Sequence, residues 1–216
     1  MLALYGHTFS SYTWKALIPL YANGTAFEFR ALDQDHPEHA AFIQGAHPAD
    51  KFPVLADGDT VTIEATAIVE YLAVHYPGTA PLLPADPAEA ATARMLDRVF
   101  DNYVMANLQR VVGAYIANMA QPDPAEVAAG KHGLLRAYRW LEGWLAGHAL
   151  PPHVSLVTCA AAPSLFYADW IERIPEDCAR VAALRAELLA LPAVVRCVDD
   201  ARPYRCLFPL GAPDRD

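Results

Sequence analysis

The chain of 216 residues has few of the short motifs that mark common enzyme classes. It has no GxGxxG, GKS or GKT sequence, which argues against a phosphate site built on a glycine-rich loop. It has no Gly-x-Ser-x-Gly sequence, so acyl-transfer chemistry has no support. Its four cysteines form no Cys-x-x-Cys pair, and neither a zinc framework nor a disulfide scaffold is predicted.

Positive charge is also scarce. The formal net charge is −9, and the only basic residues among positions 1–80 are Lys15, Arg30 and Lys51. An acidic surface without a basic stripe argues against nucleic acid or an anionic membrane as a partner. It is compatible with a local positive pocket for a small anion.

Long hydrophobic runs are missing as well. The first residues have neither a basic start nor a long apolar core, so no signal peptide is predicted. Residues 143–168 lack Asp, Glu, Lys and Arg, but Pro151, Pro152 and Pro163 would break a membrane helix there. Hydrophobic residues still make up 54% of the chain, which predicts a globular protein. We expect it in the cytoplasm, with no membrane partner.

The first eighty residues mix strand and helix patterns. Alternating apolar residues and an Asp-Gly turn indicate strands and a hairpin, and Asn23-Gly24 is an ordinary helix end. A helical connection between the first two strands predicts that they are parallel, whereas the hairpin strands are antiparallel. The predicted elements are a strand at 2–5, a helix at 10–22, a strand at 27–31, a loop or short helix, strands at 52–55 and 60–63, and a helix at 66–75.

After a proline-rich segment at 77–84, the pattern is helical. Asp-Pro-Ala-Glu occurs at Asp86 and again at Asp123, where Asp caps a helix, Pro takes its first position and Glu its third. Apolar residues at helical spacing predict one long helix from Asp86 through Tyr115 and a second from Asp123 through Leu145. Shorter helices are expected near 155–172, 176–190 and 193–201. We therefore predict an α/β domain at 1–78, a linker at 79–86 and an all-helical domain at 87–216.

Metal ligands are few. His36 and His39 could form a pair, but they are predicted in a loop with Pro37 and no cysteine is near. Asp33-Gln34-Asp35 lacks the glycine and final glutamate of a calcium loop. No metal is predicted.

Residues 6–12 connect the first strand to the first helix and contain Ser10 and Ser11. A hydroxyl there lies beside free backbone N–H groups and the positive end of the helix dipole, which together stabilise an anion such as a thiolate. The alternative is that one of the serines only caps the helix.

Two further features suit a peptide-like ligand. A cis bond before Pro53 would expose the backbone of Phe52 to such a ligand, although Pro53 could also be an edge-strand proline. Glu64 lies at a predicted strand-to-helix junction, where its carboxylate could bind an ammonium group while helix amides bind a carboxylate. Alternatively, Glu64 only complements the helix dipole.

Together these segments resemble the glutathione transferase family, in particular a serine-type, bacterial-like cytosolic member. The resemblance covers nearly the whole chain and rests on residues 4–10, 50–55, 64–72, 81–84 and 201–209. It implies a thioredoxin-like N-terminal domain followed by an all-α C-terminal domain. It also implies a homodimer, glutathione as co-substrate, and no metal.

The resemblance assigns Ser10 as the catalytic residue, which hydrogen-bonds the glutathione sulfur. Ser11, Tyr12 and Tyr5 are its neighbours and rivals for that role. Phe52, before a cis Pro53, is expected to pair through its backbone with the cysteinyl unit.

Glu64 is expected to hold the γ-glutamyl group, and Lys51 and His39 the glycyl carboxylate. Two positions depart from the family pattern. Ala65 stands where a serine or threonine is usual, so one hydroxyl donor to the γ-glutamyl carboxylate is missing. Thr158 replaces the aspartate of a Ser/Thr-x-x-Asp capping box that begins at Ser155, and it cannot return the same charge-assisted bond.

The resemblance thus implies an enzyme of detoxification that activates the glutathione thiol for attack on an apolar electrophile. The electrophile would lie between the domains, against Phe9, Tyr103 and Tyr115. One alternative is a non-catalytic glutathione-binding or protein-interaction member of the same fold. Another is a glutathione-dependent isomerase, dehalogenase or peroxidase.

Overall fold

A four-stranded sheet organises the first half of the chain in a computed structural model that describes all residues, 1–216. Its elements are β1 (Leu2–Gly6), α1 (Ser11–Ala22), β2 (Glu28–Ala31), α2 (Pro37–Ala46), β3 (Val54–Asp57), β4 (Thr60–Ile63) and α3 (Ala65–His75). The strand order is β2-β1-β3-β4, with β1 parallel to β2 and antiparallel to β3, and with β3 antiparallel to β4. These pairings confirm the predicted crossover and hairpin.

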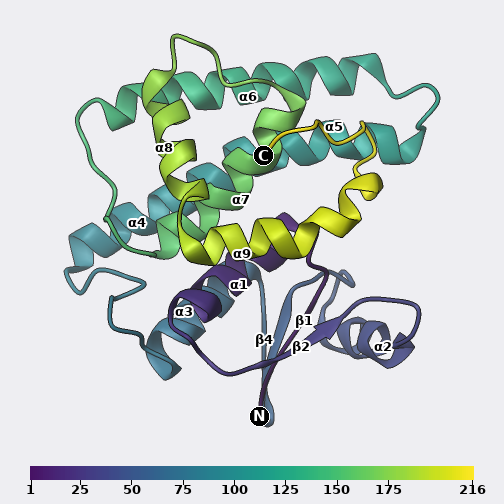
Figure 1. Cartoon of the computed structure of the whole chain (residues 1–216), viewed down its shortest axis with the longest axis vertical. Helices are drawn as coiled ribbons and strands as arrows, with labels where there is room; N and C mark the ends of the chain where they lie inside the picture. The colour runs from purple at the N-terminus through teal and green to yellow at the C-terminus, as the bar shows by residue number, and fades with distance from the viewer.

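The two faces of the sheet are covered differently. Because side chains alternate along a strand, Leu2 and Leu4 of β1 join the main core, whereas Ala3 and Tyr5 join a small separate cluster with Ile43 of α2. Figure 1 shows α1 and α3 between the sheet and the helices of the second half, with α2 lying apart from them. The α1–α3 face is therefore the one that meets the rest of the molecule.

His36 lies before the helix, as expected, but the expectation that His39 lies in a loop is wrong, because α2 begins at Pro37. Proline suits the first helical position, where its fixed φ is favourable and its missing N–H costs no hydrogen bond. The two imidazole rings stack with their centroids 5.0 Å apart. No group of three or more His, Cys, Asp or Glu side chains is placed to hold a metal ion.

The second half of the chain is helical, as predicted. Its elements are α4 (Pro87–Val99), a π-helical segment (Phe100–Met105), α5 (Ala106–Ala117), α6 (Pro124–Leu145), α7 (Leu156–Ile171), α8 (Ala179–Leu189), α9 (Pro192–Ala201) and a 3₁₀ helix (Arg202–Leu207). Asp86 and Asp123 cap α4 and α6 by accepting backbone N–H groups, as their motif predicts. The single long helix expected after Asp86 instead contains the π-helical segment.

One core joins the two halves. It comprises 45 buried residues, among them Trp14 of α1 and Phe166 of α7, whose rings lie 4.9 Å apart. Between α3 and α4 there is no helix or strand, so we propose the domain boundaries at 78 and 87. No helix combines the length and apolar character that a membrane crossing requires.

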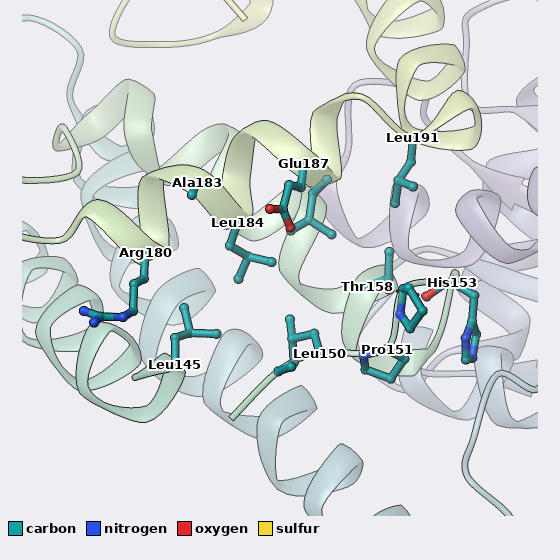
Figure 2. A pocket seen from close by; sticks show the side chains of 13 residues that line it. Leu145, Leu150, Pro151, His153, Thr158, Arg180, Ala183, Leu184, Glu187 and Leu191 are labelled. Atoms are coloured by element: carbon teal, nitrogen blue, oxygen red, sulfur yellow. Dashed lines mark hydrogen bonds between the residues drawn. The ribbon is translucent and has the colours of Figure 1, made fainter. Parts of the chain in front are cut away.

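The start of α7 has a modified cap. Ser155 accepts the Thr158 N–H at 3.4 Å, but the Thr158 hydroxyl donates to the carbonyl of His153 at 3.2 Å. Beside it lies a cavity of about 410 Å³, where Leu150 and Pro151 face Leu184 and Glu187 of α8 (Figure 2). None of the residues assigned to glutathione or electrophile binding lines this cavity.

Candidate functional site

Two cavities lie on either side of the first turn of α1, and their linings differ in charge. The polar cavity, of about 210 Å³, is lined by Tyr12, His47, Lys51, Phe52, Pro53, Glu64, Ala65, Arg98, Asp101 and Asn102. The apolar cavity, of about 220 Å³, is lined by Phe9, Ser10, Ser11, Leu108, Gln109, Val112, Ile116, Tyr167, Leu207, Phe208 and Pro209. Both cavities combine residues from the two halves of the chain.

The hairpin brings the predicted ligand-binding residues together in the polar cavity. Val54 at the start of β3 pairs with Ile63 at the end of β4, so the residues just before β3 and just after β4 are neighbours. Lys51, Phe52 and Pro53 therefore line the same cavity as Glu64 and Ala65. The Phe52–Pro53 peptide bond is cis, as the resemblance implied.

Glu64 and Ala65 lie at the start of α3. Glu64 has a positive φ of 69°, and its side chain is 74% exposed and makes no hydrogen bond to the helix. Ala65 is the first residue of the helix and is buried. Since the N–H groups of a first helical turn have no partner inside the helix, they are free to bind an anion in the cavity.

His39 does not reach this cavity, and His47 does. The His39 Nδ1 lies 2.8 Å from the carbonyl oxygen of Ala31, and its ring meets the ring of Tyr5 edge-on. His47, at the end of α2, accepts the Ala49 N–H at Nδ1, so its neutral ring carries the proton on Nε2. That Nε2 is 3.7 Å from the Glu64 carboxylate. No motif in the sequence singles it out, because only the fold brings the end of α2 to this cavity.

The helical half adds charged residues that the sequence did not reveal. Lys15 of α1 donates to Asp101 at 2.7 Å and to Thr66 at 2.8 Å, and its Nζ is 2.5 Å from Asp97. The side chains of Lys15 and Asp97 are each 1% exposed. With Arg98 these residues form an interdomain ion cluster of two cations and two anions, which is neutral overall and links α1, α3, α4 and the π-helical segment.

Burial affects the titratable groups at the edge of this cluster. It raises the pKa of Asp101, although the neighbouring Lys15 acts in the opposite direction. It also raises the pKa of Tyr12 to about 12, and the nearby Asp101 carboxylate adds to the effect. The Tyr12 phenol is therefore protonated at neutral pH and can only donate its proton in a hydrogen bond or accept one.

Ser10 is the N-cap of α1 and also lines the apolar cavity. Its oxygen accepts the Thr13 N–H at 3.3 Å, which leaves its own hydroxyl proton free to donate. Tyr12 lines the polar cavity, but two of the rivals are placed less well. Ser11 is buried and donates to the sulfur of Met105 at 3.4 Å. Tyr5 lies on the α2 side of the sheet, where its oxygen accepts a bond from Arg30 at 2.6 Å.

The apolar cavity contains Phe9 but not the two tyrosines expected beside it. Tyr103 is 59% exposed and lines a different cavity of about 420 Å³ between α4 and α6, and Tyr115 is packed partly against the core. The residues of α5 that face the apolar cavity are Leu108, Gln109, Val112 and Ile116. Its opposite wall comes from Tyr167 of α7 and residues 207–209.

Fold and site together describe a thioredoxin-like domain joined to an all-helical domain, with a polar site at their junction. Comparison with known proteins agrees. The family model "Glutathione S-transferase, N-terminal domain" matches residues 4–80. Glutathione S-transferase 1 of Dianthus caryophyllus is 31% identical over 68% of this chain and 66% of its own length. A probable maleylacetoacetate isomerase of Vibrio cholerae is 29% identical over 95% of this chain and 99% of its own.

The solved structures show the same architecture. A glutathione transferase family member from Pseudomonas fluorescens Pf-5, with bound glutathione, superposes with a TM-score of 0.73 at 22% identity, over 91% of this chain and 98% of that one. This likeness shows the fold. The chain belongs to the glutathione S-transferase family.

Proposed function

We propose that this protein is a glutathione transferase that binds glutathione in the polar cavity and an uncharged electrophile in the apolar cavity. The observation that carries the proposal is the position of Ser10. It lies in the turn that borders both cavities and has a hydroxyl proton to donate. Phe52, Lys51, His47 and Glu64 would hold the peptide so that its thiol faces Ser10.

The shift that the site must produce in the pKa of the glutathione thiol is modest. A cysteine-like thiol has a pKa of about 8.5 and is mostly protonated at neutral pH. Lowering that pKa by two units needs about 2.7 kcal/mol of preferential binding of the thiolate. A hydroxyl hydrogen bond to the thiolate, together with the N-terminus of α1, is of the right size to supply this.

The apolar cavity supports an uncharged second substrate. None of its lining residues is charged. Apart from the Tyr167 phenol, its polar side chains are those of Ser10, Ser11 and Gln109. A dicarboxylate such as maleylacetoacetate would find no counter-charge there, and desolvating it would be costly. We therefore favour attack on an apolar electrophile over isomerisation of a dianion.

We also propose that the protein acts as a homodimer in the cytoplasm. Met95, Tyr103 and Trp140 are large apolar side chains that are exposed around the 420 Å³ cavity between α4 and α6. A second copy covering this face would remove them from water. Sedimentation at micromolar concentration should give about twice the chain mass of 23.6 kDa; a single species at the chain mass would contradict the dimer.

Ala65 favours the alternative of a non-catalytic glutathione-binding member, because it removes a hydroxyl from the expected site. Two measurements distinguish the proposals: retention on immobilised glutathione, and turnover of glutathione with chlorodinitrobenzene. Retention with turnover that falls in Ser10→Ala supports the transferase. Retention without turnover across a panel of uncharged electrophiles supports the binding protein, and no retention overturns both.

A further inference from the structure

The start of α3 lacks side-chain donors for a ligand carboxylate. Ala65 has no hydroxyl, and the Thr66 hydroxyl is fully engaged within the interdomain ion cluster. Its oxygen accepts from Lys15 at 2.8 Å and also from Arg98, and its proton lies on the side of Asp97, 3.0 Å away. Only backbone N–H groups at this helix end are free.

Arg98 supplies what Ala65 and Thr66 do not. It extends from α4 to the start of α3, and its Nη2 bonds to Thr66, to Asp97 at 2.5 Å and to Asp101 at 3.0 Å. Its Nε donates to Asp97 at 3.0 Å, whereas its Nη1 makes no hydrogen bond within the chain. The side chain is 49% exposed and lines the polar cavity together with Glu64 and Ala65.

The ion cluster fixes the orientation of this guanidinium. Asp97 and Asp101 hold one edge of Arg98, and both acids are themselves held by Lys15. The free edge is therefore presented to the cavity with little conformational entropy left to lose on binding. Because the cluster is neutral overall, an entering carboxylate meets no net negative charge from it.

We propose that Arg98 binds the α-carboxylate of the γ-glutamyl unit, in place of the hydroxyl that is missing at position 65. This inference rests on the proposed function and makes Arg98 a specificity-determining residue of the helical half. The ammonium group of the same unit lies toward Glu64. The site thus requires a ligand head group that carries both charges.

Calorimetric titration with two ligands tests the assignment. One ligand is glutathione, and the other is γ-aminobutyryl-cysteinyl-glycine, which lacks only the α-carboxylate. We expect Arg98→Gln to weaken glutathione binding about tenfold or more, and to leave binding of the analogue within twofold of the wild type. Arg94→Gln is the matched control, because Arg94 also joins α4 to α3, through Glu70, but does not line the cavity.

Two further variants separate direct contact from other effects. Arg98→Gln with Asp101→Asn keeps the net charge of the cluster, so a loss that persists there comes from the missing guanidinium. Ala65→Ser should recover part of the affinity lost in Arg98→Gln. Thermal melting of each variant identifies any variant that does not fold. If Arg98→Gln does not fold, Arg98→Lys is titrated instead, because lysine keeps the charge but not the planar guanidinium. A smaller loss of glutathione affinity is expected for Arg98→Lys.

The outcomes are separable. If the wild type does not bind glutathione, the proposed function fails and the inference fails with it. If the wild type binds but the Arg98 variants bind equally well, the function stands and the role of Arg98 is overturned. An equal loss for both ligands likewise overturns it, because the effect would not depend on the carboxylate.

Discussion

The polar and apolar cavities flank the same turn of α1 but are built on different principles. The polar cavity takes charged side chains from both halves of the chain, and two of them, Arg98 and Asp101, are held in place by the interdomain ion cluster. The apolar cavity has no charged residue and closes with the C-terminal segment at residues 207–209. The difference indicates that the first ligand is selected by fixed charges and the second by size and polarity.

The largest effect is expected from Lys15→Met, which should lower the free energy of unfolding. Asp97 and Asp101 would lose their buried counter-ion, and breaking such a pair costs about 3–5 kcal/mol of unfolding free energy. Urea denaturation measures this loss. Arg110→Met is the control, because the Arg110–Glu126 pair is exposed on both sides and its removal should leave stability unchanged. Equal midpoints for the two variants would contradict the structural role of Lys15.

Ser10→Ala tests the turn between the cavities. The thiolate would lose its hydroxyl donor, so the pKa of bound glutathione should rise by about 1–2 units, with little loss of affinity. Titrating the thiolate absorbance measures the shift. The variant also loses a helix cap, which costs about 1 kcal/mol of stability. An unchanged titration would assign thiol activation to another group.

Position 65 gives a smaller effect within the polar cavity. Ala65→Ser adds a donor at the start of α3 and should tighten glutathione binding by about 1 kcal/mol, or about fivefold, after allowing for displaced water. Glu64→Gln should weaken binding, since the ligand ammonium loses its charge partner. Calorimetric titration of both variants measures these changes. Identical glutathione affinity in the wild type and both variants would contradict the binding of the γ-glutamyl unit at Glu64 and Ala65.

The smallest effect is expected at Tyr12. Its pKa of about 12 keeps the phenol protonated between pH 6 and about 9, so Tyr12 cannot take the thiol proton and could only donate a hydrogen bond to the thiolate, which is the role assigned to Ser10. Because that hydrogen bond is assigned to Ser10, Tyr12→Phe should leave the pH profile of turnover between pH 6 and about 9 unchanged. A shift of the profile to higher pH would place Tyr12 in thiol activation beside or instead of Ser10.

Features set by local chemistry were predictable from the sequence. The hairpin follows from its Asp-Gly turn, and the starts of α4 and α6 follow from Asp-Pro-Ala-Glu. Between the strands at 27–31 and 52–55 the sequence leaves a loop or a short helix open, and the structure has α2 there, with Pro37 in the first helical position. Phe52, Pro53, Glu64 and Ala65 come together because they flank the hairpin that the sequence predicts.

What escaped prediction depends on tertiary contacts. Arg98 and Asp101 look like ordinary surface charges of an amphipathic helix until α1 brings Lys15 against them. The π-helical segment contains Asp101 and Asn102, which line the polar cavity, and the amphipathic pattern of the sequence does not signal a π-helix there. The helical pattern places Tyr103 on an apolar helix, but it does not show that Tyr103 lies toward α6 and away from the apolar cavity.

The buried Lys15 also has a consequence for how the chain is made. Synthesis delivers the N-terminal half first, yet the acids that neutralise Lys15 follow much later, with Asp101 lying 86 positions downstream. Until Asp97 and Asp101 have left the ribosome, Lys15 must stay hydrated, which keeps the α1–α3 face from closing. We therefore expect the thioredoxin-like half to complete its folding only after the helical half has begun to emerge, so a nascent chain with only residues 1–78 outside the ribosome should be sensitive to protease.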